Sequence, residues 1–233
     1  MAADAGFLSA LFNLVTGRID NASGLARFIH RIGRLKSVTR VGWLDRGVPA
    51  PDAESVADHS YRVAMIVWLA SAEAAGLDRD RMIKLALLHD LAESLTGDTT
   101  PYDPAMLEDL DAESRRAALN QRQKISVDRK EAKRQAEKEA IAGLIADLAP
   151  ILHDEIASLW QELEQHETPE SRFVKEIDIL ETYLQSREYL AGDRSLPMDS
   201  FAAEVAEALT SVGVGSLRDA INSLCLDPLE ESL

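Results

Sequence analysis

Apolar residues recur along most of this chain at intervals of three and four residues, which is the spacing of one face of an α-helix. Such stripes occur around residues 7–15, 25–35, 56–75, 78–97, 132–148, 154–166, 169–184 and 201–209. No segment shows the alternation of apolar and polar residues that is typical of a half-buried strand. The pattern predicts an all-α fold organised as a single domain over residues 1–233.

Local signals mark the ends of several predicted helices. Ser55, followed three residues later by Asp58, resembles a capping box at a helix start, and Gly76 marks the end of the same helix. Residues 41–55 contain glycine and proline and are expected to form a loop. Residues 107–123 are charged and helix-prone without an apolar stripe, so we expect a helical insertion on the surface there.

The charge of the chain restricts its partners. The formal net charge is −15, which repels nucleic acid polymers and anionic membrane surfaces. A small anionic substrate would need cationic side chains close to its binding site. Aromatic residues make up only 5% of a chain that is 46% hydrophobic, which favours helices around an aliphatic core.

The termini bear on the compartment. The single cysteine, Cys225, excludes a disulfide within the chain and indicates a reducing, cytoplasmic environment. Residues 1–17 are apolar, but they lack a basic start and are too short to span a bilayer. We therefore expect an amphipathic helix rather than a signal peptide at the N-terminus.

The segment "ALLHDLAESLTGD", Ala86–Asp98, places a histidine and two acidic residues beside an apolar helix stripe. His89 and Glu93 are four residues apart and would share one helix face, with Asp90 next to them. Burying these groups is costly unless something pairs with them, and a divalent cation would do so. A partly exposed helix edge explains the same spacing.

The dipeptide alone does not decide between these interpretations, because His153-Asp154 repeats it. Asp154 precedes an apolar helix pattern and is expected to be its N-cap, which needs no metal. Asp178 lies beside the apolar stripe of residues 169–184, where a surface acid is the simplest interpretation. With His59, however, Asp178 could complete a His, His-Asp, Asp set drawn from three helices.

Four segments in one order carry a more specific resemblance: "GRLKSVTRVGW", "ESVADHSYRVAMI", "ALLHDLAESLTGD" and "RFVKEIDILETYLQSREYL". Together they resemble the HD-domain 5′-deoxynucleotidases and related eukaryotic HD-domain proteins over about residues 25–190. The resemblance implies a compact helical bundle, usually a homodimer, that removes phosphate from deoxynucleoside 5′-monophosphates with one divalent ion, Co, Mn, Mg, Fe or Zn. It leaves residues 103–126 as an insertion and 191–233 as a C-terminal extension.

The same resemblance implies a role for particular residues. The implied metal ligands are His59, His89, Asp90 and Asp178. The implied catalytic residues are Glu93 and Asp98, and the implied substrate contacts are Arg40, Trp43 and Asp98. Two neutral imidazoles and two carboxylates would bring a divalent ion near net neutrality and leave room for a water molecule and a phosphate oxygen.

Two other functions are open at this level. Some members of the wider superfamily use further histidines for a second metal, as oxygenases or phosphodiesterases, and His153 and His166 lie in the corresponding interval. Alternatively, the pocket could bind a nucleotide for sensing without turnover. The joint presence of Glu93, Asp98 and Arg40 argues for an active enzyme.

Overall fold

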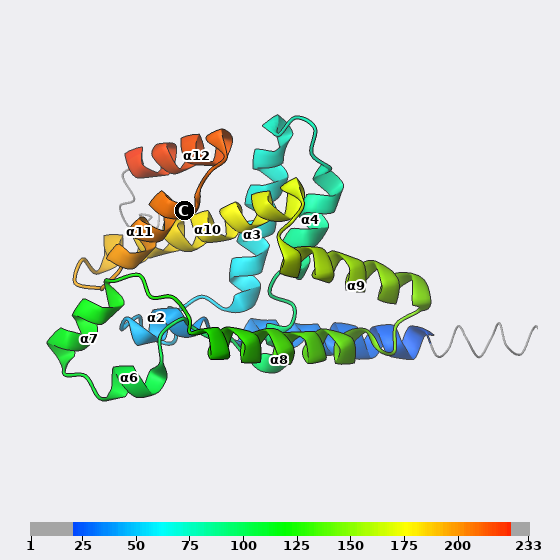
Figure 1. Ribbon diagram of the computed structural model, residues 1–233, viewed down its shortest axis with the longest axis horizontal. Coiled ribbons are helices and arrows are strands. Elements are labelled where there is room, and N and C mark those ends of the chain that lie inside the picture. Colours follow the sequence, from blue (N-terminus) through cyan, green and yellow to red (C-terminus); the bar gives the residue numbers. More distant parts are fainter. Residues whose placement is uncertain (1–20, 225–233) are drawn as a thin grey trace, which may run out of the picture.

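The computed structural model describes residues 21–224, and the predicted all-α architecture is confirmed over this range (Figure 1). The only β-type pairing among these residues is an isolated antiparallel bridge between Thr39 and Ser55. A helix covers residues 21–32 and continues into η1 (Gly33–Ser37). The predicted N-terminal stripe over residues 7–15 lies outside the described residues.

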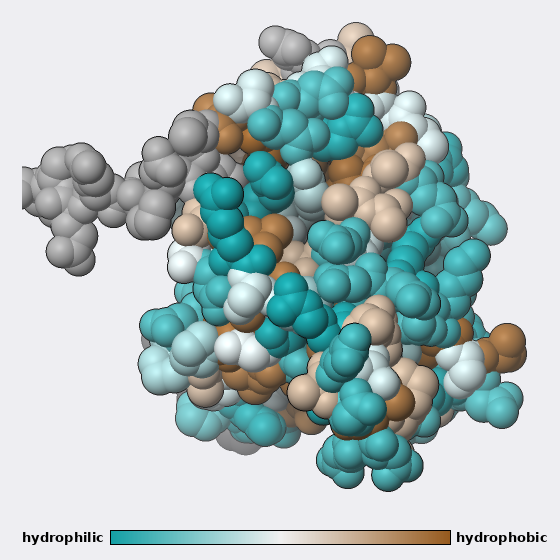
Figure 2. Space-filling model, turned by 90° about the vertical axis from the view of Figure 1, so that its left-hand side faces the viewer, coloured by the Kyte–Doolittle hydropathy of each residue, from teal (hydrophilic) through white to brown (hydrophobic). Residues whose placement is uncertain are grey.

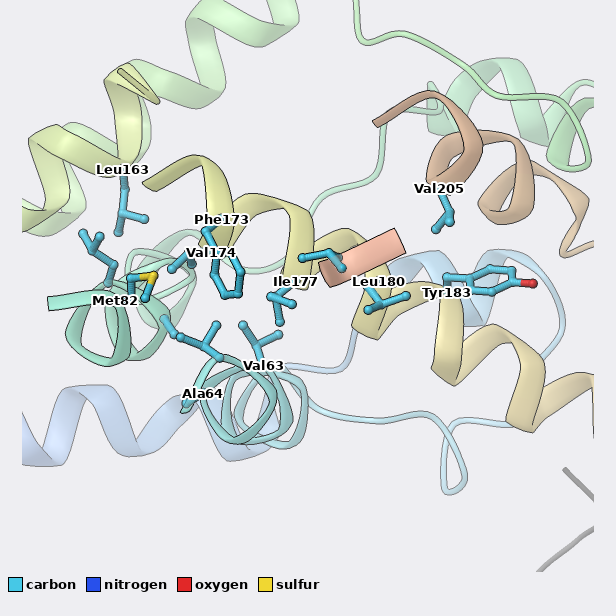
Figure 3. Packing of buried hydrophobic residues seen from close by; sticks show 14 of the residues in the cluster. Val63, Ala64, Met82, Leu163, Phe173, Val174, Ile177, Leu180, Tyr183 and Val205 are labelled. Carbon is cyan, nitrogen blue, oxygen red and sulfur yellow. The ribbon is translucent and has the colours of Figure 1, made fainter. Parts of the chain in front are cut away.

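The main core forms where α3 (Val56–Ala70), α4 (Arg79–Leu88) and α10 (Pro169–Gly192) pack against one another. Val63, Met82 and Ile177, one from each helix, are fully buried, and α9 (Pro150–Gln165) adds Leu163 (Figure 3). α11 (Asp199–Ala208) and α12 (Val212–Ser223) complete this cluster. The sequence pattern did not predict α12.

A second core lies between α8 (Val127–Ile145), the start of α3 and the helix over residues 21–32. Leu35, Val56, Ile141 and Leu144 are buried there. α8 starts five residues before the predicted stripe, with Ser126 as its N-cap. Because α8 also packs on α5 (Glu93–Thr96), it supports the segment that carries the candidate site residues.

The prediction of one continuous helix over residues 78–97 was wrong. α4 ends at Leu88, and α5 starts at Glu93. Between them, the backbone N–H groups of Leu91 and Glu93 bond carbonyls three residues earlier instead of four. This tighter winding places His89 and Asp90 in a turn between two helices.

Two predicted helix starts had different outcomes. The capping box is confirmed, because Ser55 N donates to Asp58 Oδ2 over 2.9 Å and Asp58 N donates to Ser55 Oγ over 3.2 Å. The N-cap prediction for Asp154 was wrong, because α9 starts at Pro150. Proline suits that position since a first-turn N–H has no intrahelical acceptor.

The insertion contains α6 (Pro104–Glu108) and α7 (Ala112–Leu119). Its charged residues are largely exposed, but Leu107 and Leu119 are buried with Tyr102 in a small cluster, so a purely surface location was wrong. The expected loop over residues 41–55 contains α2 (Val41–Asp45), which is short and was also missed.

The surface agrees with the acidic, polar composition. The face formed at the α6–α7 end of the molecule is mostly hydrophilic, with scattered apolar side chains (Figure 2). Among residues 21–224, none of the helices combines the length and the apolar character needed to cross a bilayer.

Candidate metal centre

Two histidines from different elements face each other at the centre of the candidate site. His59 comes from the first turn of α3 and His89 from the end of α4, and their Nε2 atoms are 3.2 Å apart. His89 Nδ1 lies 2.7 Å from the carbonyl oxygen of Ala86. Since a carbonyl only accepts, His89 Nδ1 carries the proton and the Nε2 lone pair points into the site.

Two carboxylates approach the same pair of nitrogens. Asp178 Oδ1, from α10, is 3.1 Å from His59 Nε2, and Asp90 Oδ2 is 3.2 Å from His89 Nε2 and 3.6 Å from His59 Nε2. The tightest potential ligand group consists of His59, His89 and Asp178, with Asp90 beside it. The structure therefore brings together the four residues predicted as ligands, from α3, the α4–α5 turn and α10.

The donor set fits a divalent cation. Ligand atoms around an ion at Zn–N or Zn–O distances of about 2.0–2.2 Å lie about 3.3 Å apart in a tetrahedron, close to the separations found here. Both imidazoles are oriented through Nδ1, which is how metal-binding histidines are usually held. Imidazole nitrogens with carboxylate oxygens suit Mn, Fe, Co or Zn rather than a thiolate-seeking ion.

The electrostatics of the cluster favour positive charge. Burial and the charge of Arg40 lower the pKa of His59, but its hydrogen bonds to Asp178 and Glu181 outweigh them and raise the pKa to about 9. Burial raises the pKa of Asp178, yet Lys175, whose Nζ is 2.8 Å from Asp178 Oδ2, and both histidines bring it well below its usual range. A bound cation would take the place of the proton on His59.

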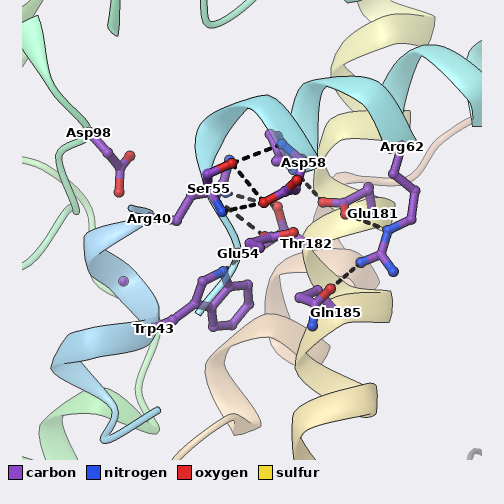
Figure 4. A network of polar contacts seen from close by, with 12 residues as sticks. Arg40, Trp43, Glu54, Ser55, Asp58, Arg62, Asp98, Glu181, Thr182 and Gln185 are labelled. Atoms are coloured by element: carbon purple, nitrogen blue, oxygen red, sulfur yellow. Dashed lines mark hydrogen bonds and ion pairs between the residues drawn. The ribbon is translucent and has the colours of Figure 1, made fainter. Parts of the chain in front are cut away.

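Glu181 contacts a predicted ligand, and the sequence patterns did not single it out. It lies one turn after Asp178 on α10, is fully buried, and contacts His59 Nδ1 through Oε2. Its other oxygen accepts a 2.7 Å bond from Arg62 Nε, and Arg62 also bonds Gln185 and Glu188 (Figure 4). The Glu181 carboxylate thus holds the proton of His59 on Nδ1 and directs Nε2 of the imidazole toward the ligand cluster.

Glu93 is buried beside the cluster. Burial, together with the charges of Asp90 and Asp98, raises the pKa of Glu93 to about 10. Its Oε2 has no hydrogen-bond partner among the described residues, and Oε1 lies 3.8 Å from Lys133 Nζ of α8. A carboxyl group in this setting holds its proton at neutral pH. Glu93 lines neither of the cavities described below, so its predicted role in catalysis stays a prediction.

Figure 4 shows Arg40 at the start of α2 with Asp98 on a neighbouring loop, whereas Glu181 comes from α10. Arg40 bonds Thr182 Oγ1 over 3.1 Å and lies 3.5 Å from Asp90 Oδ2. Gly97 has a φ of 76°, which favours glycine, and the turn it makes lets Asp98 Oδ2 accept a 2.5 Å bond from Val41 N. These contacts place one cation and one carboxylate next to the predicted metal ligands.

Trp43, predicted as a substrate contact, is almost completely buried. Its ring packs against Tyr189 and Phe201, and Nε1 donates to Glu54 Oε1 over 2.9 Å. Glu54 in turn lies 3.7 Å from Arg40 Nε. Trp43 therefore supports Arg40 through Glu54 and also lines the first of the cavities described below, and its direct contact with a substrate stays a prediction.

Two cavities open beside the cluster. The first, of about 560 Å³, is lined by Arg40, Asp98 and Asp178 together with residues of α10 and α11. The second, of about 430 Å³, is lined by His89, Asp90 and Asp178, and by cations of α8. They meet at Asp178, and the other lining residues that they share are Lys175, Ile125, Lys130 and residues 99–101. The first has the volume of a small-molecule pocket, roughly 300–1,000 Å³.

The geometry gives no support to a second metal. Among the described residues, the potential ligand groups are the one at His59, His89 and Asp178, and one at Glu54, His59 and Glu181. The second group is already neutralised by Arg40 and Arg62. His153 and His166 belong to neither group: His153 is half-buried, and His166 is exposed and lines the second cavity.

Comparisons with known proteins identify relatives of this chain. A family described as the HD domain matches residues 32–209. The chain is 36% identical over 169 residues to the 5′-deoxynucleotidase HDDC2 of Mus musculus, covering 72% of this chain and 71% of that protein. It is 39% identical over 173 residues to the 5′-deoxynucleotidase HDDC2 of Dictyostelium discoideum, covering 72% and 78%.

Solved structures share the fold. A conserved hypothetical protein from Pyrococcus furiosus superposes with a TM-score of 0.58 at 25% identity, covering 84% of this chain and 98% of the other. A crystal structure titled as a predicted metal-dependent phosphohydrolase from Magnetospirillum magnetotacticum gives 0.58 at 24% identity, covering 87% and 91%. The family match over residues 32–209 and the identities to the deoxynucleotidases establish that the chain belongs to the HD-domain family.

Proposed function

We propose that this protein removes the phosphate from deoxynucleoside 5′-monophosphates with the help of one divalent metal ion. The observation that carries the proposal is the convergence of His59, His89, Asp90 and Asp178 beside a cavity of about 560 Å³. The similarity to proteins named 5′-deoxynucleotidase supports the same substrate class.

His59, His89, Asp90 and Asp178 would hold the ion, with Glu181 and the Ala86 carbonyl orienting the two imidazoles. A divalent ion in this place supplies positive charge for a phosphate oxygen and lowers the pKa of water. Arg40 adds a fixed cation beside it, because Asp90, Asp98 and Asp178 raise the guanidinium pKa despite burial. Its planar fork suits two phosphate oxygens at once.

The proton for the leaving group has a candidate source. Hydrolysis forms a bond between the oxygen of a water molecule and phosphorus and breaks the bond between phosphorus and the 5′-oxygen, which must gain a proton to leave as a hydroxyl group. Glu93 holds a proton at neutral pH and lies beside Asp90. In our proposal Glu93 donates it through one intervening water molecule, since Glu93 lines neither cavity. Asp98 accepts a hydrogen bond from a sugar hydroxyl.

The experiment is a phosphate-release assay over a panel of substrates. The protein, treated with EDTA and then given Co²⁺, Mn²⁺ or Mg²⁺, is offered deoxy- and ribonucleoside mono-, di- and triphosphates. We expect metal-dependent release from 5′-monophosphates, with deoxyribonucleotides preferred. Nucleotide binding without release from any substrate would instead favour the sensing function.

The assembly and the location belong to this proposal as well. A homodimer of single-domain chains in the cytoplasm is what the family resemblance and the single cysteine predict. Light scattering on the purified protein tests the dimer, for which the predicted mass is twice 25.6 kDa.

A further inference from the structure

One wall of the first cavity comes from parts of the chain that supply no predicted metal ligand. Arg122, Gln123, Lys124 and Ile125 follow α7 at the end of the insertion, and Ser200, Phe201 and Glu204 belong to α11. The cavity therefore joins the predicted metal centre to the insertion and the C-terminal extension. Its shape on this side is a property of these two segments.

The wall is held in place by one buried cation. Arg46 is 6% exposed and donates to Tyr102 Oη over 3.1 Å, to Ser200 Oγ over 3.0 Å and to the Pro197 carbonyl over 3.2 Å. Its guanidinium lies 4.3 Å from the centre of the Phe201 ring. Arg46 thus connects α2, the base of the insertion and the start of α11, which fixes their relative positions.

Further contacts hold the insertion end against α11. Tyr102 Oη donates to the Leu119 carbonyl and lies 3.0 Å from the Gln121 carbonyl. Asn120 Oδ1 accepts a 3.2 Å bond from Asp199 N, and Arg122 forms ion pairs with Glu204 and Glu207. Gln123, Lys124 and Ile125 therefore line the cavity from a segment that is held against α11 by these contacts.

This wall offers a particular chemistry. Ile125, together with Ile179 of α10 and Phe201, contributes apolar surface. Gln123 is half-buried, and its side-chain amide makes no hydrogen bond to any residue that the structure describes between 21 and 224. An amide provides donors and an acceptor side by side, which complements the adjacent donor and acceptor atoms on the edge of a nucleobase.

We propose that this wall is a nucleobase subsite in which Gln123 bonds the base edge and Ile125, Ile179 and Phe201 pack on the ring. The inference rests on the proposed function and deepens it. Because Gln123 and Ile125 belong to the insertion, the insertion would make the efficiency of hydrolysis depend on the base as well as on the deoxyribose and the phosphate. Arg122 serves this subsite as a structural residue, because its charge is already paired with α11.

The test compares substrates with and without a base. Wild type, Gln123→Ala and Gln121→Ala are assayed with the four deoxynucleoside 5′-monophosphates and with 2-deoxyribose 5-phosphate. Gln121 is a matched control, since it is the same residue type two positions away and does not line the cavity. A bidentate pair of hydrogen bonds to a base edge favours the matching base by about 1–3 kcal/mol. We therefore expect a change in kcat/KM of roughly tenfold, which the assay can measure.

We expect wild type to hydrolyse at least one deoxynucleotide about tenfold more efficiently than 2-deoxyribose 5-phosphate. Gln123→Ala should remove most of that advantage by raising KM for the deoxynucleotide, and it should reduce the differences in efficiency among the four bases. The efficiency with 2-deoxyribose 5-phosphate should stay within twofold of wild type. Binding contacts made equally in ground and transition states act on KM. Gln121→Ala should match wild type.

Two other outcomes overturn the inference, and they differ in what they leave standing. Equal efficiencies with and without a base, unchanged in Gln123→Ala, would refute the subsite while the phosphohydrolase function stands. No metal-dependent release from either substrate class would refute the proposed function and the subsite together.

Discussion

Replacing Glu181 with glutamine should weaken metal binding although Glu181 is not a predicted ligand. Glu181 accepts hydrogen bonds at both oxygens, from His59 Nδ1 and from Arg62 Nε. A glutamine side chain has one acceptor oxygen and one NH₂ group, which only donates. It can therefore accept from only one of the two N–H donors, His59 Nδ1 or Arg62 Nε, in the original geometry. If its NH₂ group faces His59, the proton must move to Nε2, the atom that points toward the ligand cluster.

The expected magnitude follows from that conflict. Loss of an outer partner of a metal-binding histidine typically costs 10–100-fold in metal affinity, which is about 1.4–2.7 kcal/mol. Glu181 is completely buried, so solvent provides little compensation. We therefore expect Glu181→Gln to raise the Kd for Co²⁺ by 10–100-fold, measured by competition between the EDTA-stripped protein and a chromophoric chelator.

Glu188→Gln is the matched control. Glu188 also pairs with Arg62, over 2.8 Å, but it is 39% exposed and no contact joins it to His59 in the described structure. The Kd of the Glu188→Gln variant for Co²⁺ should stay within about twofold of wild type, because a partly exposed ion pair contributes little. Unchanged affinity in Glu181→Gln, with the fold intact by circular dichroism, would refute the role given to Glu181. Equal weakening in both variants would place the effect on Arg62 instead.

Four further predictions concern the predicted ligands and their neighbours. Asp178→Ala should lose both metal and activity while keeping its helical circular dichroism, and full metal occupancy would exclude Asp178 from the site. Glu93→Gln should retain metal but lower kcat by about 10²-fold or more, and near-normal turnover would show that Glu93 is not needed. In the metal-free protein, the raised pKa of Glu93 means that its stability contribution is present below about pH 4.5 and is lost as the pH rises toward 10. Glu93→Gln should therefore gain stability over wild type as the pH rises, by up to about 3 kcal/mol at pH 7 in urea unfolding, and a gain that shrinks with pH would contradict this. Arg40→Lys should raise KM for a 5′-monophosphate about tenfold with metal affinity unchanged, and an unaltered KM would remove Arg40 from phosphate binding.

The parts of the fold that the sequence predicted are those encoded by local patterns. Apolar stripes fixed the positions of α3, α4 and α10, and the Ser55–Asp58 pair located a helix start to the residue. The break after Leu88 was missed because the stripe continues through it. Only the backbone bonding distinguishes a continuous helix from the turn that carries His89 and Asp90.

The candidate site shows the same division. His59, His89, Asp90 and Asp178 belong to short motifs whose order is recognisable in the sequence. Glu181 lies one turn from Asp178 on the same side of α10, a spacing that could have suggested a shared site. Lys133 gave no such signal, because its contact with Glu93 joins residues 40 positions apart and depends on how α8 packs on α5.

The insertion shows why composition alone misleads. Its charged residues predicted exposure, and most of them are exposed. Two of its apolar residues, Leu107 and Leu119, nevertheless pack with Tyr102 next to the buried Arg46. Arg46 donates hydrogen bonds to residues that are distant in the sequence. Such contacts depend on the tertiary structure, so the spacing of apolar residues does not predict them.

One ion held by His59, His89, Asp90 and Asp178 should be required for phosphate release from a deoxynucleoside 5′-monophosphate. The most direct measurement titrates the EDTA-stripped protein with Mn²⁺ or Co²⁺ and records bound metal and phosphate release from the same samples. If the ion is required, release should rise in proportion to bound metal and saturate at one ion per chain. Full release from the stripped protein, or metal bound at one ion per chain without release from any 5′-monophosphate, would contradict it.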